Sequence, residues 1–179
     1  ELLEKNKNAD IKILKFMDTM LEDVEEEQFV AEERNVIDLL EKTKKNWCSD
    51  YAWLDIEIKS KEQEVFKLPE DVITVIFDNL ILNSIQQNEK KRKQLRIEIA
   101  IETTGDCIYV DYKDDGVGIA DKFKSNPMKI LEPHETSRKK GHGLGMWIIN
   151  NTLEMSGGEV LEILDNGGFE IKFTIGGNL

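Results

Sequence analysis

Two asparagines in an apolar segment have a spacing that could serve metal binding. Asn79 and Asn83 are four residues apart in the segment 78–83, whose other members are Asp, Leu and Ile, so on a helix they would share one face. Asparagine is not a strong helix former, and its amide oxygen is a suitable hard ligand for Mg²⁺. The pair is a candidate metal site; two asparagines on the solvent side of a helix are the simpler alternative.

A second candidate site is a D-x-G-x-G pattern directly after a predicted strand. It begins at Asp114, continues through Gly116 and Gly118, and is followed by Ile119. A carboxylate at a strand end can accept a hydrogen bond from an exocyclic amine such as N6 of adenine. Glycines let the backbone pass close to a flat ring, where a Cβ atom would clash. An ordinary tight turn is the alternative, because Asp-Gly turns are common.

The third candidate is a run of alternating glycines before a predicted helix. Gly141, Gly143 and Gly145 alternate with His142 and Leu144, which would expose backbone N–H groups at the positive end of the helix. That arrangement suits a phosphate chain. Three cations precede it: Arg138, Lys139 and Lys140. The run is neither a G-x-x-x-x-G-K-[ST] loop nor a glycine turn after a first strand, so the common P-loop and dinucleotide fingerprints are excluded.

Hydrophobic periodicity predicts the elements that must position these residues. Alternation of apolar and polar residues predicts strands at 53–59, 95–101, 108–112, 159–164 and 169–175. Two shorter strands are predicted at 29–31 and 65–68. Helices are predicted at 34–47, 69–88 and 144–155. Strands outnumber helices and adjacent hairpins dominate. The sequence therefore predicts an α+β fold, a two-layer sandwich in which helices cover one face of a mixed, mostly antiparallel sheet.

Two further segments bear on the organisation of the chain. The loop from Ala120 to Gly143 has little apolar periodicity, and a loop of that length is usually functional or mobile. Residues 1–28 carry apolar side chains at intervals of three and four among many charges, which predicts a helical segment separate from a domain at 29–179. That helix could fold back on the domain or form half of an interchain bundle.

The bulk properties limit the classes of partner. A net charge of −12 argues against a nucleic-acid surface, which needs clustered Lys and Arg. No apolar run approaches the length of a membrane helix, and the start at Glu1 suggests a segment of a longer protein, so any membrane anchor would lie elsewhere. Cys48 and Cys107 form no metal or disulfide pattern. They are expected to be reduced in a cytoplasmic protein, with Cys107 in the core.

The order of these motifs resembles the ATPase superfamily shared by gyrase, mismatch-repair proteins, the large heat-shock chaperone and histidine kinases. The likeness is greatest to the histidine kinase catalytic domain and covers about residues 33–179. It implies that the long loop is an ATP lid. The segment 130–137 resembles the lid box of the kinases, which typically has Phe where Leu131 and His134 stand. Many kinases also carry Lys or Arg at the position of Gln86.

The resemblance implies a role for each motif residue. Asn83 looks like the ligand of Mg²⁺ beside the ATP phosphates, with Asn79 one turn earlier, and both are the candidate catalytic residues. Asp114 looks like the adenine reader. The other residues implied in nucleotide binding are Gly116, Gly118, Ile119, Arg138, Lys140, Gly141, His142, Gly143, Leu144 and Gly145.

The resemblance also bears on the reaction. Relatives that hydrolyse ATP carry a Glu where Asn79 stands, and Asp78 would point about 100° away around the helix, so transfer to a nucleophile is favoured over hydrolysis. Neither His134 nor His142 has the setting of a phosphoacceptor. The implied partners are an upstream dimerisation domain with the acceptor histidine, a response regulator, and a second copy in a homodimer. The alternatives are a stand-alone ATPase, a non-histidine protein kinase, or a nucleotide-binding scaffold without turnover.

Overall fold

The computed structural model describes residues 34–60, 66–89, 94–105, 107–133, 135 and 143–176. The chain divides into two units, Glu1–Glu32 and Glu33–Leu179, and all described residues belong to the second. The predicted helical segment 1–28 and the predicted strand at 29–31 lie outside the described residues and stay predictions. No helix among the described residues is long and apolar enough to cross a membrane.

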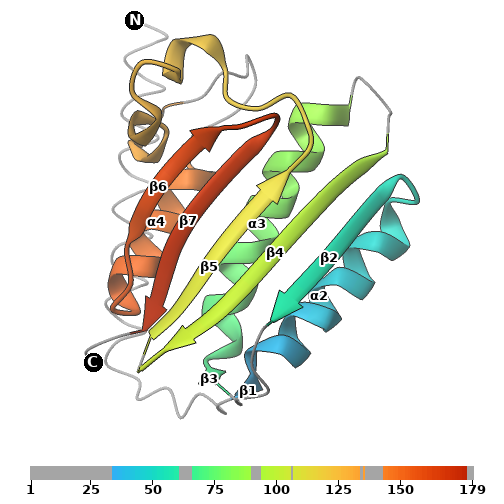
Figure 1. Cartoon of the computed structure of the whole chain (residues 1–179), viewed down its shortest axis with the longest axis vertical. Coiled ribbons are helices and arrows are strands. Elements are labelled where there is room, and N and C mark those ends of the chain that lie inside the picture. The colour runs from blue at the N-terminus through green and yellow to red at the C-terminus, as the bar shows by residue number, and fades with distance from the viewer. Residues whose placement is uncertain are drawn as a thin grey trace, which may run out of the picture. The chain divides into compact units, whose positions relative to one another are not determined.

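A mixed sheet forms one layer of the described domain (Figure 1). Its strands are β2 (Leu54–Ser60), β4 (Leu95–Thr104), β5 (Cys107–Asp114), β6 (Val160–Asp165) and β7 (Phe169–Gly176). Their order across the sheet is β2-β4-β5-β7-β6. The β2–β4 pair is parallel, and the other neighbouring pairs are antiparallel. The predicted α+β sandwich with a mixed, mostly antiparallel sheet is therefore confirmed.

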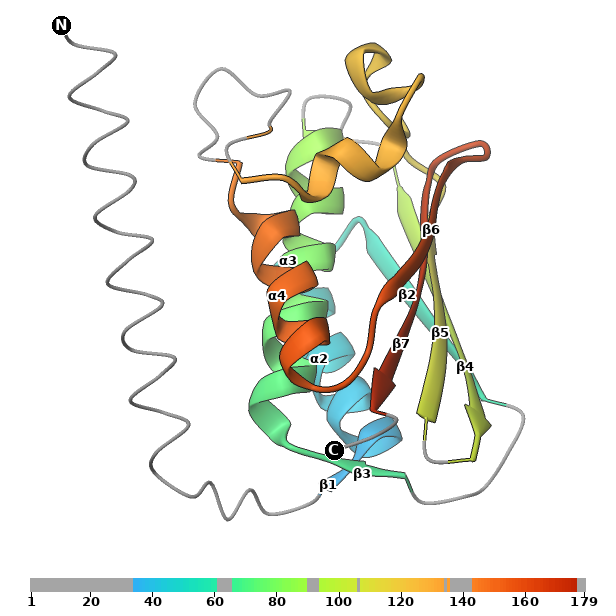
Figure 2. The same cartoon turned by 90° about the vertical axis from the view of Figure 1, so that its left-hand side faces the viewer.

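Helices cover one face of this sheet (Figure 2). They are α2 (Val36–Asp50), α3 (Glu70–Asn88) and α4 (Gly145–Met155). The core lies between the layers, where alternate residues of β5 are buried and Phe77 of α3 meets Phe173 of β7 with ring centroids 6.1 Å apart. Cys107 is the first residue of β5, and its side chain is half-buried. Because side chains alternate between the two faces of a strand, it lies on the face away from the core, and its predicted place in the core is wrong.

The first residues of two helices differ from the predicted ones. Helix α2 begins at Val36 rather than Arg34, because the Asn35 side chain accepts a hydrogen bond from the backbone N–H of Ile37 and caps the helix. Arg34–Asn35 instead forms β1, which pairs antiparallel with β3 (Lys67–Leu68). Helix α3 begins at Glu70, with Pro69 as its N-cap residue.

The described part of the predicted loop 120–143 has more structure than its sequence pattern indicates. It holds two short 3₁₀ helices, η2 (Asp121–Phe123) and η3 (Pro127–Leu131). Phe123 is 2% exposed and Leu131 is 9% exposed, so one apolar side chain anchors each of them. In Figures 1 and 2 this segment, drawn in gold, crosses the end of the sandwich where β5 and α3 end.

Candidate nucleotide-binding site

The asparagine pair on α3 faces the start of α4. Asn79 and Asn83 are both half-buried, and a Cβ atom on Gly145 would lie 3.3 Å from Asn83 Nδ2 and 3.4 Å from Asn79 Oδ1. Asn79 Nδ2 donates to the carbonyl of Val75 at 2.8 Å, which leaves Oδ1 on the side of Gly145. Glycine at position 145 therefore lets the two helices approach, and the first and third motifs meet in space.

Asp78 lies on a different side of α3. Its Oδ1 accepts a hydrogen bond of 2.6 Å from the indole N–H of Trp47 on α2. The carboxylate beside Asn79 in the sequence is thus directed toward α2 and not toward Gly145. This agrees with the expectation from helix geometry that Asp78 cannot act at the asparagine pair.

Asp114 ends β5 as a buried carboxylate with three donors. It is 3% exposed. Its Oδ2 accepts from the Ser84 hydroxyl at 2.6 Å, and its Oδ1 accepts from the backbone N–H groups of Gly116 at 2.9 Å and Phe169 at 3.1 Å. Burial raises the pKa of Asp114, and these hydrogen bonds act in the opposite direction because they favour the charged form.

The glycines of the D-x-G-x-G pattern are required by contacts within the protein. A Cβ atom on Gly116 would overlap the Asn88 side chain, and Gly118 has a φ of +70° with Asp165 Oδ1 where a Cβ would stand. The Asn88 amide oxygen accepts the Val117 N–H at 3.1 Å. The loop is therefore held between α3 and the β6–β7 turn, a role for these glycines that the sequence pattern did not indicate.

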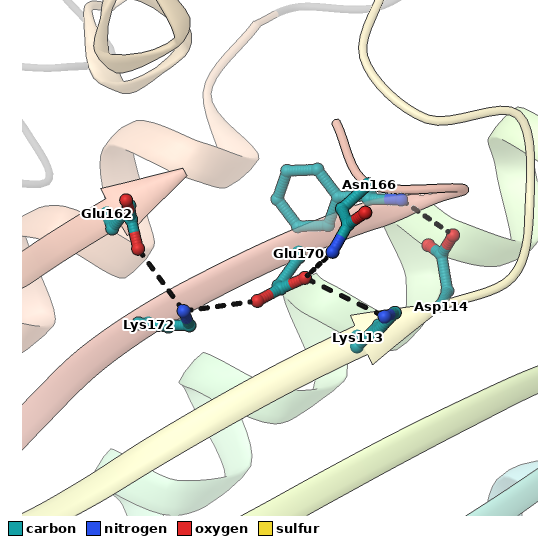
Figure 3. A network of polar contacts seen from close by, with 7 residues as sticks. Lys113, Asp114, Glu162, Asn166, Glu170 and Lys172 are labelled. Carbon is teal, nitrogen blue, oxygen red and sulfur yellow. Dashed lines mark hydrogen bonds and ion pairs between the residues drawn. The ribbon is translucent and has the colours of Figure 1, made fainter. Parts of the chain in front are cut away.

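The β6–β7 turn is fixed from the outer face of the sheet (Figure 3). Glu170 is 5% exposed; its carboxylate lies 3.8 Å from Lys113 Nζ and 3.3 Å from Lys172 Nζ. It also accepts a hydrogen bond of 3.5 Å from Asn166 Nδ2 in the turn. Phe169, the residue before Glu170, donates its N–H to Asp114, so the charge network and the buried carboxylate share one short stretch of β7.

A cleft joins the sites on α3, β5 and α4. Its empty volume is about 670 Å³, including the part open to solvent. The predicted site residues that line it are Asn83, Asp114, Gly118, Ile119, Gly143 and Gly145. Asn79, Gly116 and Leu144 are not among its lining residues, and Arg138, Lys140, Gly141 and His142 lie outside the described residues. Ten other residues line the cleft and were not predicted as site residues; they include Ser84, Gln87, Asn88 and Phe169.

The start of α4 suits a phosphate group. The helix begins at Gly145 with Leu144 as its N-cap residue, whose side chain cannot accept a hydrogen bond from the first turn. Gly143 precedes it with a φ of +68°, a conformation that favours glycine. Free N–H groups and the positive end of the helix dipole at this place favour an anion.

The described part of the segment 120–143 holds an ion-paired carboxylate at the cleft. Glu135 lines the cleft; its carboxylate lies 3.0 Å from Lys122 Nζ and 3.7 Å from Lys129 Nζ. The hydrogen bond from Lys122 holds the pKa of Glu135 below its ordinary value. Glu135 is therefore a weak base.

The part of the chain that forms this cleft matches a known protein family. The sequence model described as "Histidine kinase-, DNA gyrase B-, and HSP90-like ATPase" matches residues 69–176. The chain belongs to this family. Membership of this family implies ATP binding. It confirms the resemblance to this ATPase superfamily that the order of the motifs indicated.

The family relatives include sensor kinases. The nitrogen regulation protein NtrY of Azorhizobium caulinodans is 31% identical over 86 residues, which are 47% of this chain and 11% of that protein. The sensor histidine kinase CitA of Klebsiella pneumoniae is 27% identical over 105 residues, which are 58% of this chain and 18% of that protein. The chain thus spans only a small part of the length of these family members.

Solved structures share the fold of the family domain. The catalytic domain of histidine kinase ThkA has a TM-score of 0.66 at 21% identity, over 80% of this chain and 93% of that one. Full-length ShkA in complex with AMPPNP has a TM-score of 0.64 at 17% identity, over 80% of this chain and 30% of that one. The described domain therefore has the fold of histidine kinase catalytic domains.

Proposed function

We propose that the whole protein is a sensor histidine kinase, in which this domain binds Mg-ATP and transfers the γ-phosphate to a histidine on an upstream dimerisation domain. The observation that carries the proposal is the convergence of Asn83, Asp114 and Gly145 on one cleft. The carboxylate of Asp114 would accept a hydrogen bond from the adenine, and the amide oxygen of Asn83 would bind the metal ion. The uncapped start of α4 at Gly145 would bind the phosphates of the same nucleotide.

The adenine would lie at the deep end of the cleft. Asp114 presents a buried carboxylate there, which would accept a hydrogen bond from the exocyclic amine. Apolar side chains of Ile119, Phe123 and Met146 line the same cleft and would exclude water from the ring. This combination of an apolar pocket with one placed polar group is typical of small-molecule sites.

The donor set at the other end fits Mg²⁺. Amide oxygens of Asn83 and Asn79 lie at the start of α4, and Mg²⁺ commonly takes few protein oxygens together with water and substrate phosphates. Asn83 would hold the ion, which would neutralise charge on the phosphates. The N–H groups at Gly145 and the next residues would bind phosphate oxygens directly.

Phosphoryl transfer is supported over hydrolysis by the carboxylates near the cleft. Asn79 carries an amide, and Asp78 accepts the Trp47 indole N–H, so neither can activate water at the asparagine pair. Glu135 lines the cleft, but its lowered pKa makes it a weak base. Positioning and charge neutralisation are sufficient for transfer to a nucleophile supplied by another domain.

The proposed partners follow from transfer. The acceptor histidine would lie on a helical hairpin upstream of residue 1, the predicted helix at 1–28 would belong to that hairpin, and two chains would form a homodimer. A response regulator would then take the phosphate. The net charge of −12 makes nucleic acid an unsuitable partner.

The test combines binding with transfer. Mg-ATP is titrated into the chain by calorimetry, and a hairpin that contains the acceptor histidine is then added. Binding followed by acid-labile phosphate on the hairpin is expected. Binding with release of free phosphate would instead indicate a stand-alone ATPase, and binding without either product would indicate a nucleotide-binding scaffold. Absence of binding would contradict the proposal.

A further inference from the structure

We propose that Ser84, oriented by Tyr112, is a positioning residue that makes Asp114 select a 6-amino purine. The inference rests on the proposed function and concerns the base-reading end of the same cleft. Neither Ser84 nor Tyr112 belongs to the three motifs that the sequence singles out. Both are buried, at 3% and 0% exposure, and they connect α3 and β5 through their hydroxyl groups.

The three side chains form a chain of hydrogen bonds. The Tyr112 hydroxyl lies 2.9 Å from Ser84 Oγ, and Ser84 Oγ lies 2.6 Å from Asp114 Oδ2. Each hydroxyl has one proton to donate, and an ionised carboxylate can only accept. Ser84 must therefore donate to Asp114, and Tyr112 must donate to Ser84, so the direction of the chain is fixed while Asp114 is charged.

Counting acceptor positions leaves one for a ligand. A carboxylate has about four lone-pair positions. Gly116 and Phe169 use Oδ1, and Ser84 uses one position of Oδ2. The remaining position is on Oδ2, and because Asp114 lines the cleft, this position suits the N–H of a 6-amino group. The 6-oxo group of guanine or hypoxanthine would instead place one acceptor against another.

The influences on the pKa values of Asp114 and Tyr112 support this direction of the hydrogen bonds. Burial raises the pKa of Asp114, the nearby charge of Asp115 raises it further, and the hydrogen bond from Ser84 is the largest opposing influence. Burial also raises the pKa of Tyr112 well above its ordinary value, so the phenol keeps the proton that it donates. Removing the Ser84 hydroxyl would bring Asp114 closer to its neutral form, which can donate to a 6-oxo group.

The test measures selectivity in the full chain. Ser84→Ala and the wild-type protein are titrated with the Mg²⁺ complexes of ATP, ITP and purine riboside triphosphate, which lacks the 6-amino group. We expect about a tenfold loss of affinity for ATP and almost none for the analogue without the amine. ITP should bind relatively better. The pH below which ATP selectivity is lost should move upward.

A second substitution tests the inference if Ser84→Ala does not fold. Tyr112→Phe keeps the ring and removes the donor to Ser84, so we expect about a threefold loss for ATP alone. Matched controls are Ser156→Ala, whose hydroxyl donates to Leu153 at the end of α4, and Tyr109→Phe on the opposite face of β5. Both controls should bind all three nucleotides like the wild type.

The outcomes separate the two proposals. A wild-type protein that prefers ATP, with a reduced preference in Ser84→Ala or Tyr112→Phe, supports the inference. If the wild type prefers ATP and both variants lose affinity for all three nucleotides in the same ratio, the hydroxyls serve only the fold and the inference is wrong. A wild-type protein that binds none of the nucleotides would overturn the proposed function as well.

Discussion

At the scale of single residues, the proposed metal site depends most on Asn83. We expect Asn83→Ala to abolish Mg²⁺-dependent ATP binding, because its amide oxygen is the proposed protein ligand of the ion and Asn83 lines the cleft. Calorimetry with Mg²⁺ and with EDTA measures this. Asn150→Ala is the matched control, since the Asn150 amide donates to Glu154 on the exposed side of α4. Unchanged titration curves for Asn83→Ala would remove the metal assignment.

Asp114 gives a prediction that depends on pH. Its pKa is raised by burial, so as pH falls the carboxylate takes up a proton earlier than an ordinary aspartate. When the pH is lowered, ATP affinity should therefore begin to fall at a higher pH than it would for an aspartate of ordinary pKa. Above the raised pKa of Asp114, ATP affinity should have its full value. Asp114→Asn should weaken ATP more than GTP and should flatten this acid limb. Equal losses for both nucleotides would contradict the role in base reading.

At the scale of elements, the β6–β7 turn sets the position of Asp114. A Cβ atom on Gly168 would overlap the backbone carbonyl of Asp114, whereas one on Gly167 would meet nothing within 4 Å. We expect Gly168→Ala to lower the free energy of unfolding by about 3 kcal/mol or more, and Gly167→Ala by about 1 kcal/mol from its positive φ alone. Urea unfolding of the adjacent pair measures the difference. Similar losses would show that the turn moves freely.

The elements also show what the sequence could predict. Asn79, Asn83, Asp114 and Gly145 could be predicted as site residues because helical spacing and glycine patterns can be read directly from the sequence. Ser84 and Asn88 were not, because their partners are on β5 and in the loop after it, and a polar residue on an apolar helix does not name its partner. The start of α2 was misplaced for a similar reason, since Asn35 is both a cap and a strand residue.

At the scale of the whole molecule, the described cleft belongs to one unit of the chain. Its lining residues fall between Asn83 and Phe169, and the division between units is at Glu32/Glu33. We expect a fragment that begins at Glu33 to fold and to bind Mg-ATP like the full chain. Thermal unfolding and calorimetry of the two proteins test this. A fragment that folds but no longer binds would mean that residues 1–32 contribute to the site.

The parallel pairing of β2 with β4 has a consequence for the order in which the chain assembles. Among the described strands, β2 pairs with β4 alone, and β4 follows it only after β3 and α3. During synthesis β2 therefore leaves the ribosome before its partner exists, while β4–β5 and β6–β7 close as local hairpins. Non-local pairing is the slow part of folding. Because α3 lies within this crossover, a nascent chain becomes able to hold ATP late, after this non-local strand pair has closed.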